Sequence, residues 1–306
     1  MDFVNFNGKS RQFIVDRIQQ NGLLVRYVPV LDLEIVMKAV QQNGMALKYA
    51  IHFSSNRNVG IAAVKQNGLA LQFCSPDLRR NKEVVMEAVK QIGVALSFAE
   101  DNVKGDKEVV LAAVNENGEA LEFASPRLKA DRDVIMTAMH NTPFAIEYIP
   151  RHVMTKPFVI ELVQMNGNIL SFLHSIQLPF QSDKDVVLAA VNQNGEALKY
   201  ASYDLQSDPL VLSYAKYSTH PIEMTHEQNE QVETFLKESR DTYETFKRLS
   251  KSRTNDKSHT MKNLSNFGPY HHSNMLKKIY GFSGLDEDIL FILRKTKGGR
   301  RKTRRR

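Results

Sequence analysis

The chain has 306 residues, of which 42% are hydrophobic, and it contains a single cysteine. This hydrophobic content excludes a wholly disordered chain, and one cysteine excludes an internal disulfide framework, as is typical of reducing, intracellular compartments. The formal net charge of +7 is confined to residues 203–306, because residues 1–202 carry 21 basic and 21 acidic side chains.

Residues 1–9 precede any periodic pattern and are expected to form an N-terminal arm. From residue 10 a pattern of about 25 residues occurs eight times. Each repeat contains Asn-Gly or an equivalent dipeptide, and eleven residues before that Asn position stands a side chain that commonly caps a helix N-terminus. The eight cap residues, which begin repeats 1 to 8, are Ser10, Asp32, Asn56, Asn81, Asp106, Asp131, Thr155 and Asp183.

Apolar side chains stand 3, 4, 7 and 8 positions after the cap, which is the spacing of one face of an α-helix. In repeat 5 they are Val109, Val110, Ala113 and Val114. The pattern predicts a helix of about ten residues in which the small Ala lets neighbouring helices approach closely. The Gly that follows is expected to end this helix in left-handed geometry, which glycine adopts without strain.

A shorter pattern follows the Gly, as in Ala120-Leu121 and Phe123-Ala124. It predicts a two-turn helix with the Leu and the aromatic residue both in the core, and the Ser-Pro that comes next is expected to break it. Helices this short are marginal alone in water, so each repeat must bury its face against the next. The sequence therefore predicts an all-α fold: an α-solenoid of eight to nine helix–Gly–helix repeats over residues 10–225, closed by a degenerate half repeat.

Two segments resemble the short repeat called domain of unknown function 4116: Asp106–Ser125, which reads DKEVVLAAVNENGEALEFAS, and Asp183–Ser202. The resemblance covers roughly residues 10–205. Repeats 1, 6 and 7 depart from it; Arg17 stands in the Ala column and Pro143 replaces the Gly. The family occurs mainly in protists and in the giant DNA viruses that infect them. It has no assigned activity, so the resemblance implies the fold and leaves the function open.

Four further segments follow the array. Residues 226–252 predict an amphipathic helix, residues 253–272 a polar linker, and residues 273–295 short helices. Residues 296–306 are expected to form a disordered basic tail, and the sequence GGRRKTRRR resembles the C-terminal tails of many proteins encoded by large protist viruses.

No constellation of residues points to catalysis. The Gly-Lys-Ser tripeptide at residues 8–10 lacks the second Gly and the preceding strand of a phosphate-binding loop. His271 and His272 have no acid or cysteine at ligand spacing. Cys74 stands in a column that holds Ala in four other repeats, so we expect a buried, unreactive thiol. The sequence predicts a protein that is not an enzyme and uses neither metal nor cofactor.

A cation follows the cap in seven of the eight repeats, and an acid often stands next to it. Two interpretations remain open. Either each cation pairs with an acid of a neighbouring repeat and faces solvent, or the column binds an acidic partner. This cationic ladder consists of Arg11, Arg57, Lys82, Lys107, Arg132, Lys156 and Lys184.

Residues 294–306 carry nine cations and no acid. Such a tail can bind nucleic acid or an acidic membrane, act as a targeting signal, or simply be solvated. It lacks interleaved aromatic residues, so contacts with nucleic acid are expected at phosphates, without sequence preference. The candidate polyanion-binding residues are Arg294, Lys295, Lys297, Arg300, Arg301, Lys302, Arg304, Arg305 and Arg306.

These observations favour a binding scaffold whose helical surface holds a protein partner while the tail attaches to polyanions. The alternative is a nucleic-acid-associated protein, of a virion or its genome, that acts mainly through the tail. We expect a soluble, intracellular monomer, because no apolar run reaches the roughly 20 residues that cross a membrane and no signal-peptide pattern opens the chain. A viral protein would lie in the host cytoplasm or nucleus, or in the virion.

Overall fold

The computed structural model describes residues 6–251, and the side chains of residues 6–241. Every regular element in this part of the chain is a helix, which confirms the predicted all-α repeat fold. The predicted linker, short C-terminal helices and basic tail lie outside the described residues. Two compact units divide the described residues: an N-terminal unit that extends to Met165 and includes Ser175–Gln177, and a C-terminal unit of Asn166–His174 with the described residues from Leu178 onward.

Each of the eight repeats begins with an α-helix of ten residues, as the apolar spacing predicts. In seven repeats the predicted cap side chain accepts a hydrogen bond from an N–H of the first turn, which satisfies a donor that the helix itself leaves unpaired. The helices are α1 (Arg11–Gln20), α2 (Leu33–Gln42), α3 (Arg57–Gln66), α5 (Lys82–Gln91), α7 (Lys107–Glu116), α9 (Arg132–Asn141), α10 (Lys156–Met165) and α12 (Lys184–Gln193).

The second helix of the repeat is a 3-10 helix of six residues, which at three residues per turn is the two-turn helix that the sequence predicts. In most repeats the Asn of Asn-Gly caps this helix, because its side-chain oxygen accepts a hydrogen bond from the N–H two residues later, as Asn117 does from Glu119 at 2.9 Å. The helix that follows Ile92 forms without such a bond. Repeat 7 has an α-helix here instead, α11 (Ile169–Ser175). The 3-10 helices are η1 (Gly22–Tyr27), η2 (Gly44–Tyr49), η4 (Gly68–Phe73), η5 (Gly93–Phe98), η6 (Gly118–Phe123), η7 (Pro143–Tyr148) and η10 (Gly195–Tyr200).

Burial divides the two large side chains of the 3-10 helix. Leu121 is fully buried, as predicted, whereas Phe123 is only half-buried. The same division holds along the N-terminal unit, where Tyr27 and Tyr49 are exposed. The aromatic column therefore belongs to the surface as much as to the core.

The repeated glycine does not adopt the left-handed geometry that the sequence suggested. Gly8 is the one glycine with positive φ among the described residues, and it lies outside the repeats. The reason for glycine is instead a close approach of two backbones. A Cβ on Gly118 would lie 2.4 Å from the carbonyl oxygen of Ala138 in the next repeat, far inside van der Waals contact. The corresponding distances for Gly22, Gly44 and Gly93 are 2.2–2.3 Å.

The same glycine also donates a hydrogen bond to the next repeat. Its N–H reaches a side-chain oxygen ten positions after the following cap, as Gly118 does to Asn141 at 2.9 Å. Glycine thus joins adjacent repeats both by shape and by a hydrogen bond. The other pairs are Gly22 with Gln42, Gly44 with Gln66, Gly93 with Glu116, Gly167 with Gln193, and Gly195 with Ser218.

A third short element follows most 3-10 helices. Ser-Pro does not simply break the chain, because Pro76 and Pro126 occupy the first position of one-turn helices, where a proline loses no hydrogen bond. Each of these turns buries one apolar residue, such as Leu128. The short elements are η3 (Ile51–Phe53), α4 (Pro76–Arg79), α6 (Asp101–Lys104), α8 (Pro126–Lys129), η8 (Arg151–Val153), η9 (Pro179–Ser182) and α13 (Tyr203–Gln206).

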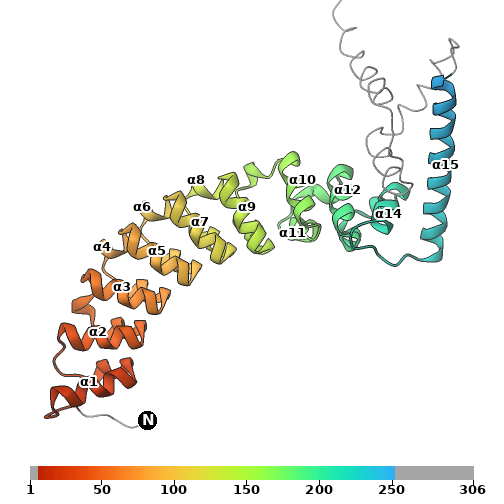
Figure 1. Ribbon diagram of the computed structural model, residues 1–306. Coiled ribbons are helices and arrows are strands. Elements are labelled where there is room, and N and C mark those ends of the chain that lie inside the picture. Colours follow the sequence, from red (N-terminus) through yellow and green to blue (C-terminus); the bar gives the residue numbers. More distant parts are fainter. Residues whose placement is uncertain (1–5, 252–306) are drawn as a thin grey trace, which may run out of the picture. The chain divides into compact units, whose positions relative to one another are not determined.

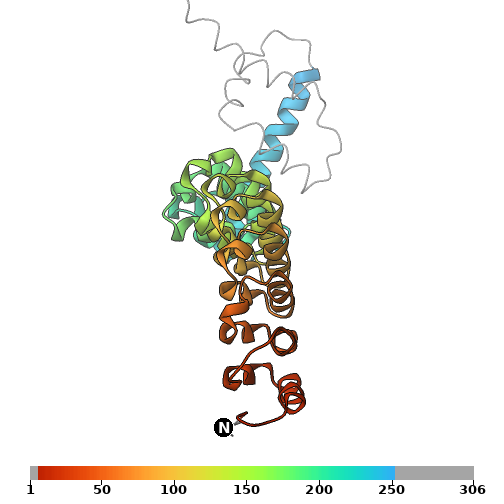
Figure 2. The ribbon, with the colours of Figure 1, turned by 90° about the vertical axis from the view of Figure 1, so that its left-hand side faces the viewer.

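In the N-terminal unit these elements form two layers. Successive ten-residue helices pack against one another in one layer, and successive 3-10 helices do so in the other. Figure 1 shows the layered row bending within the plane of the view, and Figure 2 shows the two layers side by side. The core between them consists of the Val, Ala and Leu columns, all fully buried in repeats 3 to 5. Each layer therefore has one face that points outward.

In the C-terminal unit, α14 (Pro209–Lys216) takes the place of the next ten-residue helix, and α15 (His226–Lys251) packs against it. Val232 and Leu236 of α15 are buried, and Glu233 pairs with Lys216 at 2.7 Å. The predicted stripe of α15 continues through Tyr243, Phe246 and Leu249, whose side chains lie outside the described part of the chain.

The glycine contact predicts an asymmetry between two glycines. Gly118→Ala should lower the free energy of unfolding by about 1–3 kcal/mol, the typical cost of overpacking, because the added methyl group meets the Ala138 carbonyl. Gly105→Ala is the matched control, because the nearest atom to its Cβ would be 3.6 Å away, and it should change stability by less than about 0.5 kcal/mol. Equal effects in urea unfolding would contradict this account of the repeat.

Candidate functional site

The cationic ladder occupies the N-terminal ends of the ten-residue helices. Six of its seven cations pair with acids of the following repeat. Lys107 lies 2.9 Å from the cap residue Asp131 and 2.7 Å from Asp133. Lys82 repeats this arrangement, and Lys184 reaches the cap residue Asp208 at 2.6 Å. The remaining pairs join Arg11 to Asp32 and Glu34, Arg57 to Glu83, and Arg132 to Glu161.

These pairs shift the ionisation of both partners. Hydrogen bonds from Lys107 hold the pKa of Asp131 below its usual range, and bonds to Asp133 and Asp131 raise the pKa of Lys107. Lys82 lowers the pKa of Asp106 in the same way. Each cap carboxylate thus serves two purposes, because it also accepts backbone hydrogen bonds from its own helix. Exposed ion pairs contribute little individually, at most about 1 kcal/mol each.

The ladder therefore follows the first of the two interpretations for these six cations: each pairs with a neighbouring repeat. Lys156, the seventh, begins α10 and is half-buried. Binding of an acidic partner to the ladder stays an untested prediction. The nine candidate polyanion-binding residues of the tail, residues 294–306, lie outside the described part of the chain.

A second column on the outer face of the ten-residue helices was not singled out from the sequence. It stands five positions after the cap, and in repeats 2 to 6 it is always a large apolar residue that the structure leaves half-buried. We call this column the outer apolar stripe; it comprises Met37, Ile61, Met86, Leu111 and Met136.

Polar columns flank the stripe along the helix axes. Two positions after the cap stand acids, Glu83, Glu108 and Asp133, which belong to the ladder pairs. Nine positions after the cap the outward side chains include Lys65 and Lys90. An apolar band between an acidic edge and a partly basic edge can hold an amphipathic segment in one orientation.

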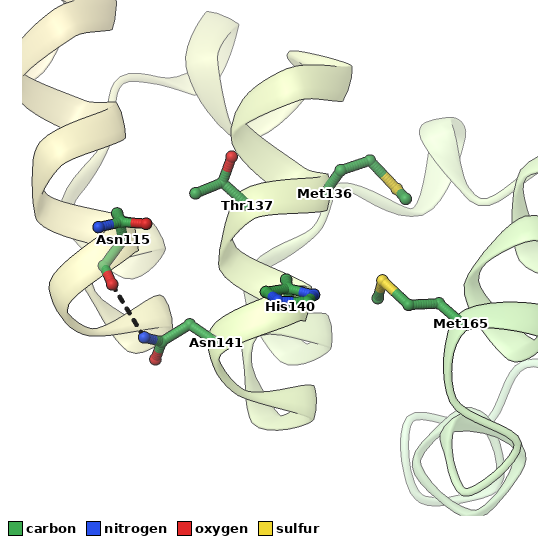
Figure 3. A pocket seen from close by; sticks show the side chains of 6 residues that line it. All are labelled: Asn115, Met136, Thr137, His140, Asn141 and Met165. Atoms are coloured by element: carbon green, nitrogen blue, oxygen red, sulfur yellow. Dashed lines mark hydrogen bonds between the residues drawn. The ribbon is translucent and has the colours of Figure 1, made fainter.

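The stripe ends at an open depression of about 490 Å³ on the outer surface of α7, α9 and α10. Met136 of α9 and Met165 of α10 extend into the space between the two helices, with His140 beside them (Figure 3). Methionine side chains adapt to differently shaped apolar groups, so a surface lined by them suits a bound side chain. Asn141, also in the wall, is held in place by donating to the Asn115 carbonyl at 3.0 Å.

Two departures from the repeat pattern coincide at this depression. Pro143 replaces the repeated glycine and has no N–H to donate, and Met165 replaces the side chain that would accept that hydrogen bond in the next repeat. Repeats 6 and 7 therefore lack the hydrogen bond that joins their neighbours. Because the position of Met165 accepts no hydrogen bond from the preceding repeat, an apolar side chain can stand there and line the depression.

The remaining groups with possible chemical roles are the single thiol and the metal-ligating side chains. Cys74 is buried, and this burial raises the pKa of its thiol to about 12. Among the residues whose side chains are described, no group of three or more His, Cys, Asp or Glu is arranged to hold a metal ion. No helix of the described chain is long and apolar enough to cross a lipid bilayer.

The comparison with protein families agrees with the geometry of the repeats. The model described as domain of unknown function (DUF4116) matches residues 10–52, 56–104, 106–154 and 155–206. The chain belongs to this family. Each DUF4116 match spans two of the structural repeats, so the family's unit is a pair of ten-residue helices with their 3-10 or short α-helical partners. No curated protein and no solved structure matches the chain.

The ladder pairs predict how stability responds to acid. Because the folded-state pKa of Asp131 is lowered, its contribution is complete above the unfolded value of about 3.9 and disappears as pH falls through the folded value. Asp131→Asn keeps the capping oxygen and cannot titrate, so its melting temperature should fall less than that of the wild type between pH 6 and pH 3. Lys107→Met should also reduce the acid sensitivity, because it removes the cation that lowers the pKa of Asp131. Identical losses in all three proteins would show that the pair contributes nothing.

Proposed function

We propose that this protein is a non-enzymatic binding scaffold, and that its outer apolar stripe binds an amphipathic helix of a partner protein. The observation that carries the proposal is the unbroken row of half-buried apolar side chains from Met37 to Met136, which crosses five stacked helices and ends in the depression at Met165. Stacking buries the other face of these helices, so the row is available for a partner.

The spacing of the repeats suits a helix as the ligand. Packed helices lie about 8–10 Å apart, which sets the distance between successive stripe residues. An α-helix rises about 10.5 Å over seven residues. A partner helix laid across the stack would thus place one apolar side chain on each repeat if its apolar residues recur every seven positions. The flanking acids and lysines would contact its polar edges.

A model peptide can test this surface directly. A helix of three heptads with apolar residues at heptad spacing should bind the full-length protein in fluorescence anisotropy, and a scrambled peptide should not. Leu111→Asp places a charge within the stripe and should weaken binding by about tenfold or more, as burial of an unpaired charge does. Tyr203→Asp is the control, because Tyr203 is an exposed apolar residue of the C-terminal unit.

Melting curves should show that both variants remain folded. Binding that survives Leu111→Asp unchanged, or absence of binding by every heptad peptide, would contradict the proposed surface.

A second candidate function rests on the nine cations in residues 294–306. We propose that the tail binds polyanions without sequence preference, and that this attaches the scaffold to nucleic acid. The ladder pairs favour a division of labour, because cations already paired with carboxylates offer less to a phosphate. A viral origin, and with it a place in a host cell or virion, stays a prediction.

The salt dependence of DNA binding tests the tail. If about six cations contact phosphates of duplex DNA, log affinity should fall against log salt with a slope of roughly −5. Deletion of residues 294–306 should abolish this binding, because residues 1–293 carry a net charge of −2. The melting temperature should stay unchanged. A truncated protein that bound with the same slope would place the site on the repeats instead.

A further inference from the structure

Charge is distributed unevenly along the N-terminal unit. Residues 6–80 contain ten basic and four acidic side chains, a net charge of +6, whereas residues 81–165 contain nine and thirteen, a net charge of −4. The first three repeats are therefore basic and the next repeats acidic. A charge gradient along a rod favours antiparallel association with a second copy, because each end then meets the opposite charge.

The gradient is clearest on the outer face of the 3-10 layer, at the fifth residue of each 3-10 helix. The first two repeats carry cations there, the middle two carry neutral polar side chains, and the last two carry acids. In chain order the column is Arg26, Lys48, Gln72, Ser97, Glu122 and Glu147. Read in reverse, the column is complementary to itself: each cation faces an acid, and the two neutral residues face each other.

These four charges differ from the ladder in having no ion-pair partner among the described residues. Arg26 lies over the Tyr27 ring at 4.5 Å. Lys48 lies 5.8 Å from the centre of the Tyr49 ring. All four charged side chains belong to exposed residues, so a second molecule could reach them.

The surroundings of this column supply apolar contact area. The sixth residue of each 3-10 helix is aromatic, and none of these rings is fully buried. The second residue is apolar in five of the six helices, and Phe144 is more than half exposed. Aromatic residues flanked by charges are typical of protein interfaces. The aromatic column comprises Tyr27, Tyr49, Phe73, Phe98, Phe123 and Tyr148.

We propose that the 3-10 face of the N-terminal unit is the interface of an antiparallel homodimer. The row of repeats bends within the plane of Figure 1, and the two layers lie one behind the other in that view, as Figure 2 shows. A two-fold axis along the radius of this bend turns one 3-10 face onto the other and superposes the two arcs with reversed direction. Repeat 1 then faces repeat 6, repeat 2 faces repeat 5, and repeat 3 faces repeat 4.

This register pairs Arg26 with Glu147, Lys48 with Glu122, and Gln72 with Ser97, each twice by symmetry. Spacing matches without adjustment because both arrays have the same repeat. This proposal differs from the monomer expected from the sequence, which stays an untested prediction. It is independent of the proposed partner site, because the outer apolar stripe lies on the opposite layer and stays exposed on both copies.

Charge reversal in the full-length protein tests the register. The wild type should sediment as a dimer at low salt and dissociate at high salt. Lys48→Glu and Glu122→Lys should each weaken the dimer by about tenfold or more, because each places like charges opposite one another twice. The two changes in one chain should restore the affinity to within about threefold of the wild type. Lys199→Glu is the control, because it reverses the same position of η10 in the C-terminal unit.

A mixing experiment separates this interface from any other. A chain with Arg26→Glu and Lys48→Glu should be monomeric, as should one with Glu122→Lys and Glu147→Lys, whereas an equimolar mixture should form a heterodimer. Carbodiimide should join Lys48 to Glu122 in the wild-type dimer. These residues lie three repeats apart in one chain, roughly 30 Å, so that cross-link must be intermolecular. A wild type that stays monomeric, or single reversals that leave the dimer intact, would overturn the proposal.

Discussion

The contact between a glycine Cα and the carbonyl of the next repeat sets the dimensions of the array. A side chain at Gly118 would collide with the Ala138 carbonyl, so the two backbones lie too close together for any residue but glycine. That approach requires Ala on the facing helix, and it brings the glycine N–H to Asn141. Helix length follows from it as well, because the acceptor must stand ten positions after the cap. The repeated Gly, the Ala of the facing helix and the hydrogen-bond acceptor at its end are thus all consequences of one close contact.

Once the repeats are stacked, their surface charges divide into two kinds. The ladder cations lie beside carboxylates of the next repeat, as Lys107 lies beside Asp131, and these charges are balanced within the chain. The charges on the 3-10 face, such as Lys48 and Glu122, have no such ion-pair partner within the described structure, and they are ordered by sign along the row. The balanced ion pairs join neighbouring repeats and contribute little individually. A column of charges that is ordered by sign and not balanced within the chain can instead bind a second molecule of complementary charge. The ladder charges therefore contribute to packing within the chain, whereas the charges of the 3-10 face are available for binding.

Much of the fold was predictable because a helical period and a cap are local signals. The eight ten-residue helices follow from residues such as Asp106 and Val109 without knowledge of their neighbours. The role of Gly118 could not be predicted in this way, because its reason lies in Ala138, and a sequence gives no distance between repeats. The Ser125-Pro126 dipeptide predicts a break after the 3-10 helix, but Ser before Pro is also a common helix start. Residue propensity alone does not distinguish these two outcomes. The outer stripe was visible as the column of Met86, Leu111 and Met136, but its exposure depends on which face the stack buries.

The paired departure at Pro143 and Met165 has a consequence for how the array unfolds. In a row of repeats, the free energy that couples neighbours determines how many of them open together. At this junction the donor and its acceptor are both missing, and α9 and α10 contact each other less than the successive ten-residue helices of repeats 1 to 6 do, so the coupling between repeats 6 and 7 is weaker than between repeats 1 to 6. Thermal opening is therefore expected to stop or start there, which makes repeats 1 to 6 one cooperative block. Such a boundary lets one end of the chain lose its order while the other keeps its bound partner.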